Sequence, residues 1–477
     1  MDIKISGHDF EYDITSMSML FFPGEKVNYV NRSKNTNHII SSLKNVDDKL
    51  VSKTTFYFNN KVFTSQKTAS VDCGQKNLVK QTFYKACSKA TGIESPWGIL
   101  TGIRPLSVFA KHSLEGDNAA EIMASEYYLK PSKIEILESI YNIQNQIMSD
   151  PKDISIYISI PFCPSKCSYC SFISVAATNT STLLDEYLLK LEEEIKIKSK
   201  IISDFGFKVK SLYIGGGTPG ILSCKQITKL LDICDSCFDI KSIDETCIEI
   251  GRPELISNEK LSLLKKFNFN RICINTQTTN DVVLDKINRK HTYLQYTDSV
   301  ELAKKYEFDS INTDLIAGLP GEDYSSFCKS VNDVIDNGVN NITIHTLAIK
   351  KSAKLSEDKS NYNANNSSVS DMLEYAYGAL VKNGFVPYYI YRQKNCVSNG
   401  ENIGFCKPDA VCKYNVYMME DVHTVISCGA GASTKIINGK KTDRIINVKY
   451  PMEYVREFDK ILNNTQKITD ILKENFK

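Results

Sequence analysis

The chain has 477 residues and a formal net charge of +2, from 58 basic and 56 acidic side chains. A chain of this length can bury a large core and is expected to form about two to four domains. The near balance of charge argues against a nucleic-acid-binding protein, which would carry a clear basic excess. The first residues, MDIKISGHDFEYDI, have no basic stretch before an apolar run, and no apolar run is long enough to cross a bilayer. We therefore expect a cytoplasmic protein without a membrane span.

Residues 1–150 are predicted to form an accessory α+β domain. Polar, strand-like pieces such as KTTFYFNNKVFT come first, and helix-like segments follow around NLVKQTFYKACSKATG and KIEILESIYNIQNQIM. The single tryptophan lies between these helices, in SPWGILTGIRP. No part of this region has the spacing of a catalytic motif, so its sequence predicts a fold without indicating a chemistry.

Residues 151–350 repeat one pattern: a short apolar run rich in β-branched residues, a turn, and a helix-like segment. Such units predict parallel strands with right-handed crossovers. The strand candidates are residues 154–160, 211–216, 246–250, 271–275, 310–318 and 341–348. Six units are too few for a full eight-fold barrel. They predict an α/β fold built on an incomplete (β/α)6 TIM-like barrel, with its active end at the carboxyl ends of the strands.

The sequence changes character after Ala348. The segment SEDKSNYNANNSSVS is predicted to be a loop or linker from its composition. A mixed segment follows it, and residues 351–477 are predicted to form a C-terminal domain that completes the substrate site.

Three of the fifteen cysteines stand close together in IPFCPSKCSYCSF, directly after the first predicted barrel strand: Cys163, Cys167 and Cys170. In a reducing compartment most other cysteines are expected to be small buried hydrophobic residues. A zinc site closes with four ligands, and no fourth Cys or His lies nearby. A cubane iron–sulfur cluster bound by three thiolates keeps one iron open to an outside ligand. The spacing favours the cluster over a zinc ion and over three free thiols.

The Cys-x3-Cys-x2-Cys spacing, with Tyr169 before the last cysteine, is the signature of the radical S-adenosylmethionine (SAM) family. More narrowly, YISIPFCPSKCSYCSF resembles the oxygen-independent coproporphyrinogen III oxidase (dehydrogenase) family. Later motifs agree in order and spacing: YIGGGTPGIL, CIEIGRPELI, INTQTTNDVVLDKINRKHT and INTDLIAGLPGE. The segments SPWGILTGIRP, YRQKN, ENIGFCKP and GAGAST are similar to a longer, HemZ-type subgroup of that family. The resemblance covers essentially the whole chain.

This resemblance implies a [4Fe-4S] cluster on the three cysteines, SAM at the open iron, and two SAM molecules in all. The residues agree with small-ligand binding, because a glycine-rich turn admits close approach of backbone groups. A carboxylate inside an apolar strand, such as Glu249, needs a partner. Without the resemblance, each cofactor-binding position could also be explained structurally, as part of a tight turn, a surface polar group or a core residue. The cofactor-binding positions implied are Tyr157, Tyr169, Gly216, Gly217, Thr218, Glu249, Gln277, Arg289, Asp314 and Ala348.

The resemblance further implies oxidative decarboxylation of two propionates of coproporphyrinogen III to the vinyl groups of protoporphyrinogen IX, in haem biosynthesis. A 5′-deoxyadenosyl radical would remove hydrogen from the propionate β-carbon, and a donor such as flavodoxin or ferredoxin would reduce the cluster. No residue is assigned a catalytic role. Arg104, Arg252 and Arg392 are candidates to bind the propionates, although each is better explained as a surface arginine.

Two departures from the family pattern keep other functions open. Phe172 stands where decarboxylating relatives carry a further cysteine, and Ser159 replaces a histidine of the motif. We therefore retain two alternatives: a radical enzyme that opens the tetrapyrrole ring in haem degradation, and a haem-binding chaperone without the chemistry.

The remaining cysteines suggest two weaker hypotheses. Four C-terminal cysteines could bind an auxiliary cluster, although their spacing matches no compact motif: Cys396, Cys406, Cys412 and Cys428. Cys234 and Cys237 form a CxxC pair without a second pair, and are predicted to be structural.

Overall fold

The computed structural model describes residues 1–72, 74–102, 104–147, 149–172, 174–176, 181–350, 353–356, 367–393, 396–397, 400–439 and 441–475. Cys73, most of the predicted linker SEDKSNYNANNSSVS and part of YRQKN lie outside the described residues. The chain divides into two compact units, Met1–Tyr141 and Asn142–Lys477. The predicted division into domains 1–150, 151–350 and 351–477 stays a prediction.

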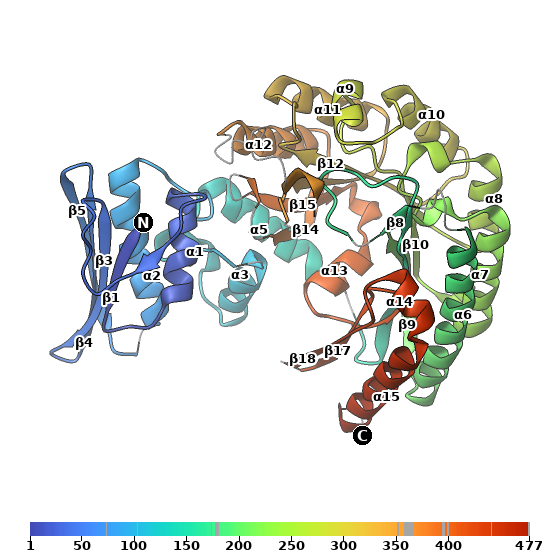
Figure 1. The fold of residues 1–477 in the computed structure, drawn as a ribbon, viewed down its shortest axis with the longest axis horizontal. Helices are drawn as coiled ribbons and strands as arrows, with labels where there is room; N and C mark the ends of the chain where they lie inside the picture. Colours follow the sequence, from blue (N-terminus) through green and yellow to red (C-terminus); the bar gives the residue numbers. More distant parts are fainter. Residues whose placement is uncertain are drawn as a thin grey trace. The chain divides into compact units, whose positions relative to one another are not determined.

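The N-terminal unit is a five-stranded sheet with a shared hydrophobic core beneath helices α1 and α2 (Figure 1). Residues 53–64, predicted as strand-like, form the hairpin of β4 and β5, whose turn residues Asn59 and Asn60 both have positive φ. Such a two-residue turn matches the twist of the strands that it joins. In the sheet order, the strands are β2 (Asn28–Tyr29), β1 (Asp2–Ser6), β3 (His38–Val46), β4 (Lys49–Phe58) and β5 (Lys61–Ser70). The helices are α1 (Glu11–Phe21), α2 (Gln75–Thr91), α3 (Pro105–Leu114), α4 (Ala119–Ser125) and α5 (Pro131–Gln144).

The second unit contains the predicted barrel. Six parallel strands are neighbours in chain order, which confirms an α/β fold with an incomplete six-unit barrel. Strands buried on both faces read as apolar runs, and for this reason all six were identifiable from the sequence. They are β6 (Asp153–Ile160), β9 (Lys208–Gly216), β10 (Glu245–Glu249), β11 (Arg271–Cys273), β12 (Ser310–Ala317) and β13 (Asn341–Thr346).

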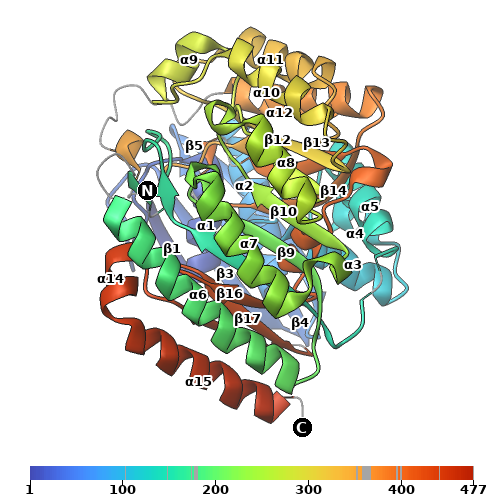
Figure 2. The ribbon, with the colours of Figure 1, turned by 90° about the vertical axis from the view of Figure 1, so that its right-hand side faces the viewer.

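Helices cover the outside of these strands, and Figure 2 shows α6, α7 and α8 side by side. Their apolar faces pack on the sheet, as expected for right-handed crossovers. The crossover helices are α6 (Ser181–Asp204), α7 (Cys224–Phe238), α8 (Asn258–Lys266), α9 (Asp281–Lys286), α10 (Tyr293–Lys304) and α11 (Tyr324–Asp336).

The chain after the barrel extends the same sheet at both edges, giving eleven strands. On one side β15 pairs antiparallel with β13 and β14, and on the other β16 pairs parallel with β6. The strands are β14 (Val386–Arg392), β15 (Glu401–Cys406), β16 (Thr424–Cys428), β17 (Ser433–Asn438) and β18 (Lys441–Ile446). The helices are α12 (Ser367–Lys382), α13 (Lys413–Met419), α14 (Pro451–Arg456) and α15 (Phe458–Asn475).

A buried charge network joins α6 to the loop after β16. The Glu194 carboxylate accepts hydrogen bonds from Lys198 Nζ at 2.5 Å and from the Gly429 backbone N–H at 2.7 Å. The Gly429 backbone has φ 101°, and a Cβ there would lie 2.7 Å from the Ser159 carbonyl oxygen. Ser159, at the position where the family motif has a histidine, donates to the Ala430 carbonyl. The GAGAST segment therefore supports the strand that leads into the cysteine loop.

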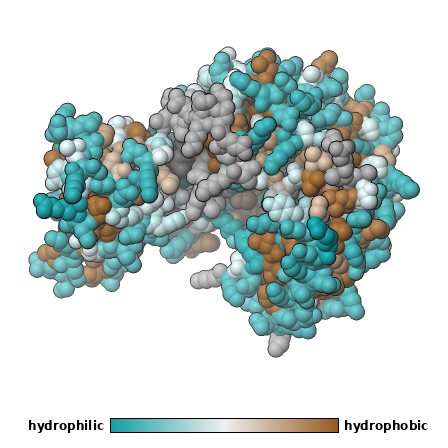
Figure 3. Space-filling view, viewed as in Figure 1, coloured by the Kyte–Doolittle hydropathy of each residue, from teal (hydrophilic) through white to brown (hydrophobic). Residues whose placement is uncertain are grey.

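On the face seen in Figure 3, hydrophobic residues are scattered among hydrophilic ones. Within the described ranges, the structure contains no helix with the length and apolar character needed to cross a bilayer.

Candidate cofactor site

A cavity of about 420 Å³ opens at the carboxyl ends of the barrel strands. Each of the six strands, or the loop after it, contributes to the lining. Every predicted site residue lines this cavity except Tyr157. Tyr157 lies in β6, and its ring stacks on that of Tyr213 with 6.2 Å between the ring centroids. The Tyr213 hydroxyl in turn donates to Glu249 Oε1 at 2.5 Å. The spacing of motifs along the sequence therefore corresponds to one location in space.

The cysteine loop begins with β7 (Phe162–Cys163), which pairs with β8 (Val175–Ala176). The rest of the loop is attached to its surroundings: Ser168 N–H donates to the Ile287 carbonyl at 3.0 Å. Asn288 Nδ2 donates to the Lys166 carbonyl at 2.8 Å. Thr218 Oγ1 lies 3.3 Å from Cys163 Sγ. The segment after α9 and the glycine-rich turn thus hold the loop in place.

The thiols do not have the arrangement of a single-ion site. Of the described residues, His112, Glu115 and Asp117 form a group whose possible ligand atoms all lie within 4.8 Å of one another, and the three cysteines do not. Ligands of one tetrahedral zinc ion are that close. In a four-iron cube each thiolate binds its own iron, and wider spacing of the sulfur atoms follows. Burial raises the pKa of Cys170, so its thiolate form requires nearby positive charge such as bound iron.

The glycine-rich turn after β9 is packed against the start of the cysteine loop. A Cβ at Gly217 would lie 2.6 Å from the Phe162 carbonyl oxygen, and only glycine fits this approach. Gly217 N–H donates to the Ile160 carbonyl, and Thr218 N–H donates to the Phe162 carbonyl at 2.7 Å. The GGGTP sequence thus shapes the wall of the cavity beside Cys163.

The surroundings of two carboxylates in the cavity shift their pKa values in opposite directions. Burial raises the pKa of Glu249 to about 7, although the hydrogen bond from Tyr213 opposes this. Burial also acts to raise the pKa of Asp314, but the hydrogen bond and charge of His345, together with hydrogen bonds from Asn312 and Thr343, lower it below its usual value. His345 Nε2 lies 3.7 Å from Asp314 Oδ2. Near neutral pH the cavity therefore contains one readily protonated carboxyl group and one stable anion.

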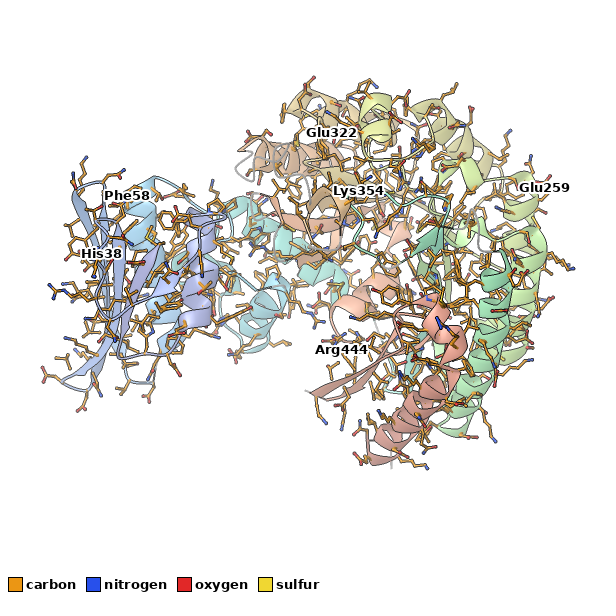
Figure 4. The ribbon with its side chains drawn as sticks, viewed as in Figure 1. His38, Phe58, Glu259, Glu322, Lys354 and Arg444 are labelled. Atoms are coloured by element: carbon orange, nitrogen blue, oxygen red, sulfur yellow. The ribbon has the colours of Figure 1, made fainter. Side chains whose placement is uncertain are left out.

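Gln277 enters the cavity because its backbone is held in an unusual conformation. Its φ is 75°, which is uncommon for a residue other than glycine. Gln277 N–H donates to the Asp314 carbonyl at 2.9 Å, and Ile316 N–H donates to the Gln277 carbonyl at 3.0 Å. The next residue, Thr278, donates to the buried Glu322, which lies between β12 and α11 (Figure 4).

Two buried atoms of the lining have no hydrogen-bond partner in the described part of the chain: Asn275 Oδ1 and Arg289 Nε. Such groups are costly unless a ligand satisfies them. SAM carries a carboxylate that can accept from a guanidinium and amino groups that can donate to an amide oxygen. The residues present therefore fit SAM beside a cluster on the three thiols.

Two of the three arginines that were considered for binding propionates are buried, although surface positions were expected. Arg252 and Arg392 are 2% and 3% exposed, so neither is a surface residue. Arg252 lines the cavity and contacts the cysteine loop, whereas Arg392 lies in β14. Arg104 precedes α3 in the N-terminal unit.

A deeper cavity of about 250 Å³ was not expected from the sequence. It shares Glu249, Asp314 and His345 with the first cavity and extends to Arg271 and Asn341 at the strand starts. A sequence signal existed: polar residues alternate with apolar ones in the strand segments 310–318 and 341–348. Asn341, in the second of these segments, donates a hydrogen bond to the Ala410 carbonyl in the chain before α13.

The C-terminal cysteines do not gather at one point. Cys412 lies 3.6 Å from Glu245 Oε1, and Cys396 lies 3.9 Å from the Thr346 carbonyl. Cys406 and Cys428 belong to β15 and β16, which flank opposite sides of the six barrel strands in the sheet order. This arrangement gives no support to an auxiliary cluster. Cys234 is buried within α7, as predicted for a structural residue.

Residues 157–334 match the family model of the radical SAM superfamily. Over 396 residues the chain is 34% identical to the oxygen-independent coproporphyrinogen-III oxidase-like protein HemZ of Bacillus subtilis (strain 168), covering 80% of this chain and 79% of that protein. The chain belongs to the radical SAM family, in its HemZ-type, coproporphyrinogen oxidase-like group. Membership of the radical SAM family implies a [4Fe-4S] cluster and SAM.

Other relatives of this radical SAM chain carry different names. It is 31% identical over 294 residues to the heme chaperone HemW of Lactococcus lactis subsp. lactis (strain IL1403), covering 59% of this chain and 69% of that protein. The structure of coproporphyrinogen III oxidase (HemN) from Escherichia coli aligns with a TM-score of 0.54 and 23% identity, over 67% of this chain and 72% of that one. That likeness shows the fold.

Proposed function

We propose that this radical SAM protein is an oxygen-independent coproporphyrinogen III dehydrogenase, which converts two propionates of its substrate into vinyl groups. The observation that carries the proposal is the convergence of the family's motif residues on one cavity at the carboxyl ends of the strands. The oxidase-like name of the HemZ relative supports the same reaction class.

The cysteine loop would bind the cluster through Cys163, Cys167 and Cys170, and SAM would bind at the open iron. Once the cluster had received one electron from the donor, cluster and SAM would together supply a 5′-deoxyadenosyl radical that removes one hydrogen atom. Glu249 and the glycine-rich turn would bind this first SAM molecule. Gln277, Arg289 and Asp314, which line the same cavity, would bind a second one. Further contacts to the cofactors would come from Tyr169 and Thr218 beside the cluster, Gly216 and Gly217 in the turn, Ala348 after β13, and Tyr157 acting through Tyr213.

In each half of the proposed reaction, loss of hydrogen from the propionate β-carbon is followed by loss of carbon dioxide and of one electron to an acceptor. The protein's task is to exclude water and to hold the anionic propionates. Arg252 and Arg289 are engaged with the cysteine loop. Lys166 and Lys350 line the cavity and are exposed, and they are the better placed cations for this task.

Two alternatives are retained. A haem-binding chaperone is favoured by one observation, the 31% identity to a protein named a heme chaperone. Opening of a tetrapyrrole ring would use the same cofactors. The electron donor in either enzymatic case would be a small carrier such as flavodoxin or ferredoxin.

Anaerobic incubation with coproporphyrinogen III, SAM and a reductant tests the proposal. We expect vinyl-bearing product with release of two molecules of carbon dioxide for each porphyrinogen, and no product from Cys170→Ala. Incubation with haem in place of the porphyrinogen provides the comparison. An opened ring would support haem degradation, and tight haem binding without turnover of either compound would support the chaperone; both results would contradict the dehydrogenase.

A further inference from the structure

Two buried guanidinium groups face the sulfur of one cluster ligand. Arg252 Nη2 lies 3.3 Å from Cys167 Sγ, and Arg289 Nη1 lies 3.8 Å from the same atom. Both arginines are buried, and Cys167 is the most buried of the three thiols. Positive charge is therefore concentrated at one corner of the cysteine loop, away from solvent screening.

Arg252 is fixed in this position by several contacts. Its Nη2 also donates to the Ser165 carbonyl at 2.8 Å and lies 3.2 Å from Ser165 Oγ. Its Nη1 lies 3.5 Å from Glu254 Oε1, and that carboxylate is partly exposed. Because the side chain has little freedom, its charge acts on the cluster from a constant direction.

The other ligands have different neighbours. Cys163 is contacted by the neutral hydroxyl of Thr218 at 3.3 Å. Arg289 divides its hydrogen bonds among Tyr169, Gly251 and Asn275, and is more distant from Cys167 than Arg252 is. Arg252 therefore carries the strongest direct contact between a cation and a ligand sulfur among the contacts that the structure describes.

We propose that Arg252 is a positioning residue that sets the reduction potential of the cluster, by holding a buried cation against the Cys167 thiolate. Reduction adds one electron to the cluster and increases its negative charge. A neighbouring cation and a hydrogen bond to sulfur stabilise this reduced form and raise the potential. Glu254 opposes Arg252, because its carboxylate offsets part of the guanidinium charge. This inference needs the cluster but none of the candidate reactions.

Redox titration of the reconstituted full-length protein, with the reduced cluster detected by electron paramagnetic resonance and without SAM, tests the proposal. For Arg252→Gln we expect at least a tenfold fall in the equilibrium constant for one-electron reduction, which is 59 mV toward more negative potential. Arg252→Lys should keep most of the wild-type potential because it retains the charge. Lys196→Gln removes an exposed cation of α6 and should leave the potential unchanged.

Glu254→Gln leaves Arg252 in place and should shift the potential in the opposite, positive direction. If Arg252→Gln does not take up a full cluster, the Glu254→Gln variant decides the question. A positive shift of its potential supports the proposal, and a wild-type potential overturns it. Full iron content in Arg252→Gln together with a wild-type potential would also overturn it. Loss of turnover at an unchanged potential would point to a substrate-binding role and would equally contradict the inference.

Discussion

Each compact unit contains a well-connected cluster of buried polar side chains, and the two clusters differ in charge. In the N-terminal unit, Thr82 Oγ1 lies 2.8 Å from Ser52 Oγ and 3.1 Å from Thr54 Oγ1, which forms a neutral hydroxyl cluster. In the barrel unit, Glu194 and Lys198 form a charged cluster that also binds the Gly429 backbone. Neutral groups satisfy one another at small cost, whereas buried charges require complete pairing. In the barrel unit the Glu194–Lys198 pair therefore supports the loop after β16, against which β6 packs.

The largest expected effect is a loss of bound iron, tested by comparing two buried thiols, one in each unit. Cys167→Ala removes a proposed cluster ligand, and we expect loss of the visible absorption of the cluster and of most bound iron. Cys87→Ala in the N-terminal core is the matched control, because Cys87 is fully buried in α2 among apolar residues. Iron analysis after anaerobic reconstitution measures both. Unchanged iron in Cys167→Ala would contradict the ligand assignment.

The second prediction compares the charged and the neutral cluster directly. Glu194→Gln leaves Lys198 buried without its counter-charge, and should lower the free energy of unfolding by about 3 kcal/mol. Thr82→Val removes a hydroxyl from the neutral cluster, and should cost about 1 kcal/mol. Urea denaturation, followed by a probe in each unit, gives both values. Equal losses of unfolding free energy in the two variants would show that the charge of the cluster does not affect its contribution to stability.

The third effect, which is at most as large as the second, concerns pH. Burial raises the pKa of Glu322 from 4.5 to about 7. Between these values the folded protein holds a proton that the unfolded chain has lost, so this group's contribution to stability falls as pH rises. The loss is about 1.4 kcal/mol per pH unit, or about 3 kcal/mol at most.

Glu322→Gln should remove this contribution, and the variant should gain stability relative to the wild type between pH 5 and pH 8. Denaturation midpoints at these two pH values measure the change. Thr82→Val serves as the control, since a hydroxyl does not titrate in this range. A constant difference between Glu322→Gln and the wild type across the window would contradict the assigned pKa.

The sequence predicted the barrel and the residues around its mouth well. Apolar β-branched runs mark strands buried on both faces; the glycine-rich turn follows such a run directly, and Glu249 lies within one. The placement of Arg252 could not be predicted, because a single arginine after a strand carries no periodic signal. The deeper cavity was also missed, since it depends on which strand residues face inward. The pairing of β16 with β6 joins segments too far apart in the sequence for local patterns to reveal.

The pairing of β6 with β16 has a consequence for protein synthesis. Ser155 of β6 contacts His423, 268 positions later in the chain. During translation the strand that precedes the cysteine loop keeps one edge unpaired until β16 has left the ribosome. Exposed strand edges promote association with other chains. Insertion of iron into this loop is therefore expected to follow synthesis of β16, and truncations before residue 424 should accumulate as aggregates.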